Sequence, residues 1–231
     1  MSTIQDIAAR IVYEDNHLII VNKRAKEPVQ GDISGDMPLL EKVKRYLKET
    51  YNKPNRVFCG LVHRLDRPVS GIVIFTKTSK ALSRMNELVK ERKIQKIYHA
   101  IVENPLPSSE GHLIHYLIKN ESQNKSYVSP TLKEKYKRAE LAYRTIGSSE
   151  RYTLVEVELI TGRHHQIRAQ LAYTGSPIKG DLKYGARRSN PDGSISLHAA
   201  RVSFEHPVNH QRITVNALPL NEEFAKLWQI E

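Results

Sequence analysis

The chain has 231 residues, 39% of them hydrophobic, so it is long enough to build a sizeable core. It carries 36 lysine and arginine residues against 25 acidic ones, a formal net charge of +11. This excess favours a polyanionic partner such as RNA, DNA or an anionic membrane, although a merely soluble basic surface explains the charge about as well. The single cysteine, Cys59, excludes an intramolecular disulfide and a zinc site built on paired cysteines.

The sequence predicts neither a leader peptide, nor a membrane-spanning helix, nor a linker between domains. The N-terminus lacks a basic start followed by an apolar run, and no apolar stretch approaches the roughly 20 residues that a membrane helix needs. We therefore expect a soluble protein that is not exported, and the single cysteine fits a reducing cytoplasm. We also expect a monomer. Because the sequence has no internal repeat, low-complexity tract or Gly/Ser linker, we expect one continuous domain over residues 1–231, with residues 1–10 as a short N-terminal extension.

The N-terminal part predicts a β-hairpin followed by a helix. Residues 10–14 and 18–23 are β-rich and are separated by residues that favour a tight turn. A helix should follow and end at Thr50, with Asp36 as its N-cap and Pro38 in its first turn.

The middle of the sequence alternates strands with other elements. Apolar, β-branched runs at residues 57–61 and 72–76 predict two strands with a loop between them. A helix should begin after Thr78 and lead into a strand at residues 94–102. Residues 119–138 are polar, basic and weakly periodic, which predicts a mobile excursion that either touches RNA or is simply solvated.

The C-terminal part adds strands and two helices. Residues 153–160 alternate as a strand, and from His164 to Leu171 a helical spacing takes over. Strands are expected at residues 197–204 and 212–215, and a terminal helix at residues 221–228. The strand-rich count predicts an α+β fold, with a mainly antiparallel mixed sheet and inserted helices.

The loop between the two central apolar strands concentrates charged side chains. It holds the carboxylate of Asp66, the guanidinium groups of Arg64 and Arg67, and the imidazole of His63. Reactive groups are often presented by such loops on a rigid scaffold. From this segment alone, however, a structural ion pair between Asp66 and a flanking arginine is the better explanation.

Four ordered stretches resemble the RluA family of RNA pseudouridine synthases. The segment His63-Arg64-Leu65-Asp66-Arg67-Pro68-Val69-Ser70-Gly71, followed by an apolar strand, resembles the central motif of the family. The other three stretches are Lys96-Ile97-Tyr98-His99-Ala100, Thr161-Gly162-Arg163-His164-His165-Gln166-Ile167-Arg168 and Gly180-Asp181-Leu182-Lys183-Tyr184-Gly185. The similarity spans roughly residues 11–224 and makes a chance match improbable.

The resemblance implies a stand-alone catalytic domain that isomerises a specific uridine in structured rRNA or tRNA to pseudouridine. This reaction breaks the bond between ribose and nitrogen, rotates the uracil and rejoins it through carbon, so no cofactor is implied. It needs an ionised carboxylate that attacks the nucleotide or stabilises positive charge on the sugar. The family assigns that role to the aspartate matching Asp66.

The resemblance also assigns roles to three other residues. Arg168 matches the arginine that keeps the carboxylate charged. The less favoured alternative is that Arg168 is a surface arginine with no role in the site. Tyr98 matches the tyrosine that stacks on the uracil and is a candidate to take a proton from the sugar, although a strand tyrosine is more often part of a core. Arg64 is the candidate to fill the gap that a flipped base leaves, with a salt bridge as its alternative.

Five basic residues in these motifs are the candidates for RNA contact: His63, Arg64, Arg67, Arg163 and Lys183. His63 and Leu65 are also expected to pack and orient the Asp66 segment. The histidine pairs at residues 112 and 115 and at 164 and 165 lack a third ligand at suitable spacing, so we expect structural histidines and no metal.

The chain departs from the family pattern at a few positions. The family usually has a proline after Lys23, a glycine where Lys26 stands and a histidine where Gln170 stands, and these differences bear on the shape of the N-terminal loop and on the substrate choice. Many relatives carry a small RNA-binding module ahead of the catalytic domain, and we expect none here.

The alternatives to a synthase are a catalytically silent RNA-binding or ribosome-assembly protein of the same fold, and a glycosylase that uses the aspartate for hydrolysis.

Overall fold

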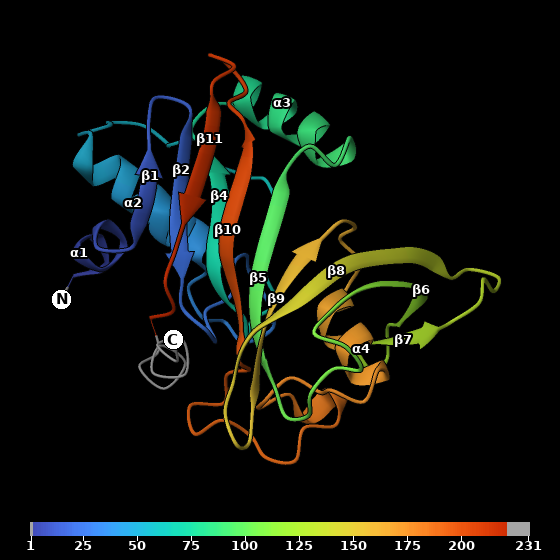
Figure 1. Cartoon of the computed structure of the whole chain (residues 1–231). Coiled ribbons are helices and arrows are strands. Elements are labelled where there is room, and N and C mark those ends of the chain that lie inside the picture. The colour runs from blue at the N-terminus through green and yellow to red at the C-terminus, as the bar shows by residue number, and fades with distance from the viewer. Residues whose placement is uncertain (1, 221–231) are drawn as a thin grey trace. The chain divides into compact units, whose positions relative to one another are not determined.

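The computed structural model describes residues 2–220, which fall into two compact units (Figure 1). The first unit holds the residues up to Ile94 together with Arg201–Leu218, and the second holds Gln95–Ala200. Helices accompany antiparallel strands in both, which confirms the α+β class. One continuous domain over the whole chain stays a prediction, and the helix expected at residues 221–228 lies outside the described residues. No helix in the described part is both long and apolar enough to span a membrane.

The first unit is built on antiparallel strands whose apolar side chains are buried. Its central pairing joins β2 to β4, from Leu18 opposite Thr76 to Lys23 opposite Gly71, and β2 is buried along its whole length. The strands and strand segments of this unit are β1 (Ile11–Glu14), β2 (Leu18–Lys23), β3 (Gly60–Leu61), β4 (Ser70–Thr76), the end of β10 (Leu197–Glu205) and β11 (Arg212–Asn216). The predicted hairpin of β1 and β2 is confirmed. The strand predicted at residues 57–61 covers only Gly60–Leu61, and Phe58 before it is exposed instead of buried in a sheet.

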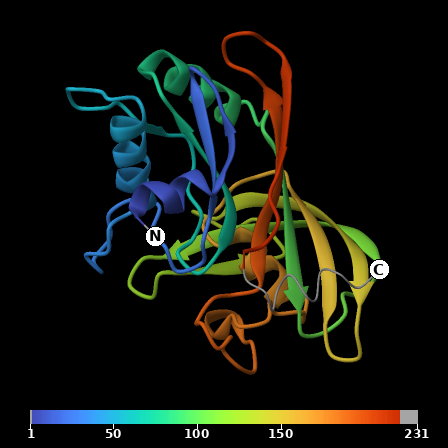
Figure 2. The same ribbon diagram turned by 90° about the vertical axis from the view of Figure 1, so that its left-hand side faces the viewer.

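Three helices accompany these strands: α1 (Thr3–Ala8), α2 (Leu39–Thr50) and α3 (Ser79–Lys90). Helices α1 and α2 lie side by side on one face of the strands (Figures 1 and 2). Helix α1 was not predicted, although its signal is present: Ser2 and Gln5 form a reciprocal capping box. The prediction of Asp36 as an N-cap is wrong. Helix α2 begins after Pro38, and the backbone carbonyls of Pro28 and Val29 accept from its first N–H groups at 2.8 and 3.1 Å.

The second unit contains five antiparallel strands in the order β5-β9-β8-β6-β7. They are β5 (Gln95–Val102), β6 (Glu110–Asn120), β7 (Lys125–Ser129), β8 (Lys137–Ser148) and β9 (Thr153–Leu159). The expectation of a mobile excursion over residues 119–138 is wrong, because β7 pairs with the end of β6 and β8 begins at Lys137. Val128 of β7 packs on a core cluster that includes Leu117 and Ala169, and this contact explains the ordered strand.

Helix α4 (Gln166–Tyr173) and the short 3-10 helix η1 (Leu182–Tyr184) complete this unit. Helix α4 packs against β6 and β7, and its residues from Gln166 to Leu171 are all buried. It begins two residues later than predicted, because His165 at its N-cap adopts a left-handed conformation with φ 51°. The chain leaves the helix through Gly175, whose φ of 87° suits glycine.

A buried lysine joins two segments of the first unit. The side chain of Lys23, at the end of β2, has no exposed surface. Its Nζ donates to the backbone carbonyls of Arg24 and Glu27, each at 2.8 Å, and to that of Arg67 at 3.2 Å. The backbone N–H of Lys26 also donates to the Arg67 carbonyl, at 2.6 Å. The turn after β2 is thereby fastened to the segment that carries Asp66.

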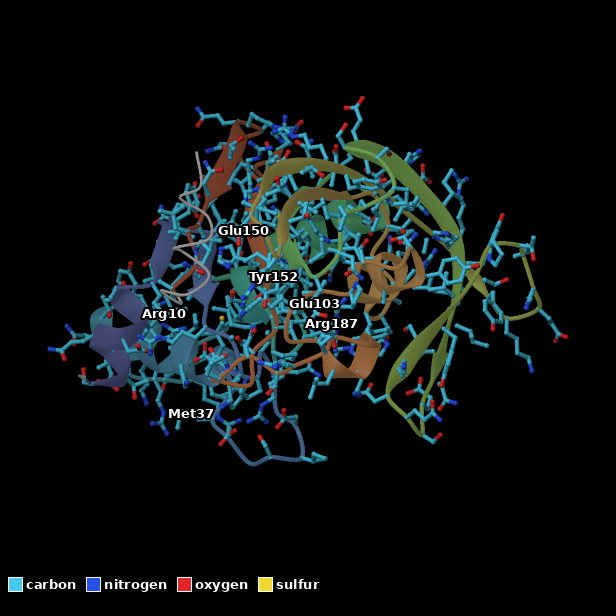
Figure 3. The ribbon with its side chains drawn as sticks, turned by 60° about the horizontal axis from the view of Figure 1, so that its bottom comes forward. Arg10, Met37, Glu103, Glu150, Tyr152 and Arg187 are labelled. Carbon is cyan, nitrogen blue, oxygen red and sulfur yellow. The ribbon has the colours of Figure 1, made fainter. Side chains whose placement is uncertain are left out.

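The carboxylate of Glu27 extends this polar network to the helices. It accepts from Arg10 Nη1 at 2.8 Å and from Lys42 Nζ of α2 at 2.6 Å. Arg10, labelled in Figure 3, is buried and also pairs with Asp6 of α1 at 2.6 Å. Each buried charge in this group therefore has a partner of opposite sign or a carbonyl, as burial requires.

Burial of Lys23 gives the stability of the first unit a pH dependence. Burial lowers the pKa of Lys23 to about 7, opposed by the negative charges of Glu27 and Asp66 and assisted by Arg10 and Arg67. Between pH 7 and the ordinary lysine pKa of 10.5, the unfolded chain holds a proton that the folded chain has lost. The contribution of Lys23 to stability therefore rises with pH through this window and falls as the pH drops to 7.

We predict that Lys23→Met will flatten this dependence. Relative to the variant, the wild-type free energy of unfolding should rise by up to about 1.4 kcal/mol per pH unit between pH 7 and 10.5, because methionine cannot titrate. Urea unfolding at intervals from pH 6 to pH 10 measures the difference. Parallel curves for the two proteins would show that Lys23 titrates normally in the folded state.

Lys26 offers a second test beside the same segment. Its φ of 68° lies in the left-handed region, where a side chain is strained and glycine is not. We predict that Lys26→Gly will be more stable than Lys26→Ala by about 1 kcal/mol, because both lose the same charged side chain and only glycine relieves the strain. Urea unfolding of both variants checks this, and equal stabilities would contradict it.

Candidate active site

Asp66 lies in the loop between β3 and β4, which we call the Asp66 loop (residues 62–69). The carboxylate residue is partly buried, while Leu65 and Val69 on either side of it are buried. Within the loop, the Asp66 carbonyl accepts from Val69 N–H at 3.0 Å and closes a turn around Pro68. At its start, His63 Nε2 accepts from the backbone N–H of Ile74 at 3.4 Å. The loop is therefore anchored on both sides of the aspartate.

Sequence reasoning missed Lys23 as a charge that interacts with Asp66. The negative charge of Asp66 acts on the Lys23 ammonium and raises its pKa against the effect of burial, so the two groups interact. The signal in the sequence was a lysine two residues after the apolar run Leu18–Val21, a position that a strand buried along its length would bury as well. Lys23 thus supports the Asp66 loop through the Arg67 carbonyl and also places a cation near its carboxylate.

The two arginines that flank Asp66 have different surroundings. Arg67 forms ion pairs with Asp32, at 3.2 Å, and with Asp36, both from the loop before α2. Arg64 is exposed on the Asp66 loop. The structure thus gives Arg67 two carboxylate partners other than Asp66, and it presents Arg64 to solvent. Contact of either arginine, or of His63, with RNA stays a prediction.

The other predicted site residues belong to the second unit, and Arg168 is the most firmly held. It projects from α4, is 5% exposed and forms a two-pronged ion pair with Asp181, which is 1% exposed. Nε donates to Oδ2 at 2.7 Å and Nη2 donates to Oδ1 at 2.9 Å. The guanidinium carbon also lies 5.1 Å from the centre of the Tyr184 ring. Such parallel bonds fix the plane of a guanidinium as well as its position.

Tyr184 is held in turn by groups from β7 and from the turn before α4. Its hydroxyl accepts from the backbone N–H of Ser126 at 2.8 Å and lies 3.0 Å from His165 Nδ1. The imidazole rings of His164 and His165 stack with their centres 3.7 Å apart. Burial raises the pKa of Tyr184, opposed by the Ser126 bond and by the charge of Arg168, so the hydroxyl stays protonated near neutral pH.

The remaining predicted residues of this unit lie on its strands and turns. Tyr98 is buried in β5, opposite Val157 of β9. Arg163 Nε donates to the carbonyl of Arg138 at 2.9 Å, and Lys183 Nζ donates to the carbonyl of Asn124 at 3.1 Å. Both basic side chains thus contribute to the turns around α4 and β7. The convergence of Tyr98 and Arg168 on Asp66 stays a prediction.

Gln170, where the family usually has histidine, is a packing residue in this chain. It is fully buried on α4, and its Nε2 lies 3.0 Å from His115 Nδ1 and 3.3 Å from the Leu113 carbonyl, both on β6. The departure therefore falls where α4 meets the sheet. Across residues 2–220, no group of three or more histidine, cysteine or acidic side chains is placed to hold a metal ion.

Comparison with known proteins identifies the relatives of this chain. A family model described as RNA pseudouridylate synthase matches residues 17–173. A Vibrio parahaemolyticus protein named ribosomal large subunit pseudouridine synthase C is 32% identical over 233 residues, covering 98% of this chain and 70% of the relative. A Vibrio cholerae protein named ribosomal large subunit pseudouridine synthase D is 29% identical over 237 residues, covering 96% of this chain and 71% of the relative.

Solved structures agree at the level of the fold. Human RNA pseudouridylate synthase domain containing 4 matches with a TM-score of 0.81 and 20% identity, covering 98% of this chain and 95% of that one. Human RNA pseudouridylate synthase domain containing 1 matches with a TM-score of 0.71 and 22% identity, covering 90% and 82%. The family model matches residues 17–173, and the bacterial relatives align with almost the whole chain. This chain therefore belongs to the RluA family of RNA pseudouridine synthases, which are isomerases.

Proposed function

We propose that this chain converts a specific uridine of large-subunit ribosomal RNA into pseudouridine, with Asp66 as the catalytic carboxylate. The observation that carries the catalytic assignment is the position of Asp66, partly buried on a loop anchored at both ends and close enough to the buried Lys23 to affect its charge. The choice of ribosomal over transfer RNA is supported by the relatives named for the large subunit, two of which match at 32% identity over 98% and 99% of this chain.

The chemistry requires a carboxylate that is ionised when the base is bound. The bond between the ribose C1′ and N1 of uracil breaks, and N1 keeps the electron pair. C1′ then joins to C5, the hydrogen of C5 leaves as a proton, and N1 takes up a proton, so the product is an isomer of the substrate. The Asp66 carboxylate either attacks the nucleotide or stabilises the positive charge that develops on the sugar. Within the first unit, Lys23 adds a positive charge that interacts with Asp66 while its ammonium is protonated, at pH values below about 7.

Arg168, Tyr98 and Arg64 have proposed roles on the same uridine. Arg168 provides a second cation that cannot lose its proton, and its ion pair with Asp181 keeps it in one orientation. Tyr98 faces the uracil and is the candidate to take a proton from the sugar and to return it to the same carbon, because the ribose of the product keeps all its hydrogens. Arg64, which is exposed on the Asp66 loop, fills the space that the extruded base leaves.

The basic surface completes the proposal. With a net charge of +11, the chain should attract RNA at long range, and His63, Arg67, Arg163 and Lys183 are the proposed contacts beside the reacting residues. Transfer RNA, which the resemblance left open, is the alternative substrate, and a monomeric state and a cytoplasmic location stay predictions.

We predict that Asp66→Asn will abolish isomerisation. RNA labelled with tritium at C5 of uridine should release label with the wild type and release it at least about a thousandfold more slowly with the variant, because asparagine can neither attack nor carry the negative charge. Glu134→Gln, which removes an exposed carboxylate of the second unit, serves as the control and should release label at the wild-type rate.

The same assay tests the substrate. Label should leave large-subunit ribosomal RNA transcripts and stay in a transfer RNA pool. Release from transfer RNA alone would overturn the substrate assignment, and equal rates for Asp66→Asn and wild type would remove Asp66 from the reaction.

A second prediction concerns Arg168. Arg168→Ala should lower the rate of label release by about a hundredfold or more, while RNA binding stays within about threefold, because the lost cation acts on the reacting groups rather than on the RNA backbone. Filter binding and single-turnover release measure the two effects. Turnover near the wild-type rate would exclude Arg168 from the active site.

A further inference from the structure

We propose that Asp181 and Tyr184 are positioning residues of this enzyme, which hold the guanidinium of Arg168 in the orientation that its catalytic role requires. The inference rests on the proposed role of Arg168. It assigns a function to the segment of residues 180–185, which sequence analysis linked only to a family motif and to a predicted RNA contact at Lys183.

The ion pair fixes one edge of the guanidinium. Asp181 accepts from Nε and from Nη2 of Arg168, at 2.7 and 2.9 Å, so both of its oxygens bind the same edge. The other N–H groups of Arg168 consequently lie on the Nη1 side of the fork. Two parallel bonds prevent rotation about the last side-chain bonds, which a single bond would allow. Asp181 thus decides the direction in which Arg168 presents its remaining donors.

Tyr184 supports the same guanidinium through its ring. The Arg168 guanidinium carbon lies 5.1 Å from the ring centre, within the range of a cation–π contact. The ring cannot turn away freely, because its hydroxyl accepts from Ser126 N–H at 2.8 Å and lies 3.0 Å from His165 Nδ1. These bonds connect the ring to β7 and to the N-cap of α4, the helix that carries Arg168.

Asp181 sits on a turn whose backbone is itself constrained. Its carbonyl accepts from Tyr184 N–H at 3.0 Å and from Ala186 N–H at 3.1 Å. Gly180 before it has φ 87°, and a Cβ there would lie 2.8 Å from the Ser194 carbonyl oxygen and from the side chain of Asn190. Only glycine fits both the angle and the space, so the carboxylate projects from a backbone with little freedom.

The far end of the turn is anchored as well. The backbone N–H of Arg187 donates to both carboxylate oxygens of Glu103, at 3.1 and 3.0 Å, and the two residues lie next to each other in Figure 3. The segment that carries Asp181 and Tyr184 is therefore fixed after the 3-10 helix as well as before it.

A purely stabilising role explains this arrangement less well. A buried ion pair adds little stability compared with apolar side chains of the same volume, because both charges lose their hydration. What the pair does provide is one geometry for a group that would otherwise adopt several rotamers. That property matters for a guanidinium that acts on reacting atoms, since small displacements of catalytic groups are costly.

The test separates positioning from stability. Asp181→Asn keeps one acceptor oxygen and loses the second bond and the charge. We expect the single-turnover rate of label release to fall about tenfold to a hundredfold, with the apparent KM for RNA changed less than about threefold. Glu14→Gln is the matched control, because it breaks the partly buried ion pair with Lys77 at 2.8 Å in the other unit. It should lower the melting temperature and leave the rate unchanged.

A double-mutant cycle provides the decisive readout. In an Arg168→Ala background, Asp181→Asn should cause no further loss of rate, because its only route to the reaction has been removed. A further loss of the same size as in the wild type would overturn the proposal, as would an unchanged rate for Asp181→Asn alone. Full turnover in Arg168→Ala would instead refute the proposed role of Arg168, and the positioning role with it.

Tyr184→Leu gives an independent variant if Asp181→Asn does not fold. It keeps the ion pair and removes the ring beside the guanidinium, so a several-fold loss of rate is expected. Tyr184→Phe keeps the ring and loses only its hydroxyl bonds, so it should lose less rate than Tyr184→Leu. An unchanged rate for Tyr184→Leu would overturn the role of the ring.

Discussion

The constraint on which the first unit depends is that the buried ammonium of Lys23 must be satisfied. An ammonium group has three N–H donors and no acceptor, so burial requires three acceptors at close range. The chain supplies them as backbone carbonyls, two from the turn after β2 and one from Arg67 of the Asp66 loop. Satisfying one cation thereby joins two segments that lie more than forty residues apart in the sequence. That junction holds the backbone at the residue that follows Asp66.

The second unit meets the same requirement with a different donor. Arg168 is buried like Lys23, but its planar fork is matched by one carboxylate instead of several carbonyls. The two parallel hydrogen bonds of a guanidinium fix the orientation of its plane, whereas the hydrogen bonds of an ammonium group fix only the position of its nitrogen. Lysine therefore suits the task of gathering backbone segments, and arginine suits the task of presenting donors in one direction. Each unit thus uses the buried cation that its task requires.

Much of the strand framework could be predicted from the sequence, because apolar, β-branched runs such as those of β2 and β4 have few other places to go than a buried sheet. The predictions failed where contacts between residues distant in the sequence, and not the local sequence pattern, determined the structure. Asp36 resembles an N-cap, but carbonyls of residues 28 and 29 already bind the first N–H groups of α2. The polar composition of residues 119–138 concealed β7, which exists because Val128 packs on a distant cluster.

For the site, motif order indicated Asp66, Tyr98 and Arg168, but no local pattern could show that Asp181 binds Arg168, because that pairing depends on tertiary structure.

The departures from the family pattern affect the supports of the site rather than its proposed reacting groups. Lys26 stands where the family usually has glycine, and the backbone there still adopts the left-handed conformation that glycine tolerates best. The chain keeps this conformation at the cost of strain, because the Lys26 N–H is needed as a donor to the Arg67 carbonyl, at 2.6 Å. Lys23 binds the same carbonyl, so two independent donors hold the residue that follows Asp66. A substitution that would loosen a loop in isolation is tolerated here, because the second donor keeps the Asp66 loop in place.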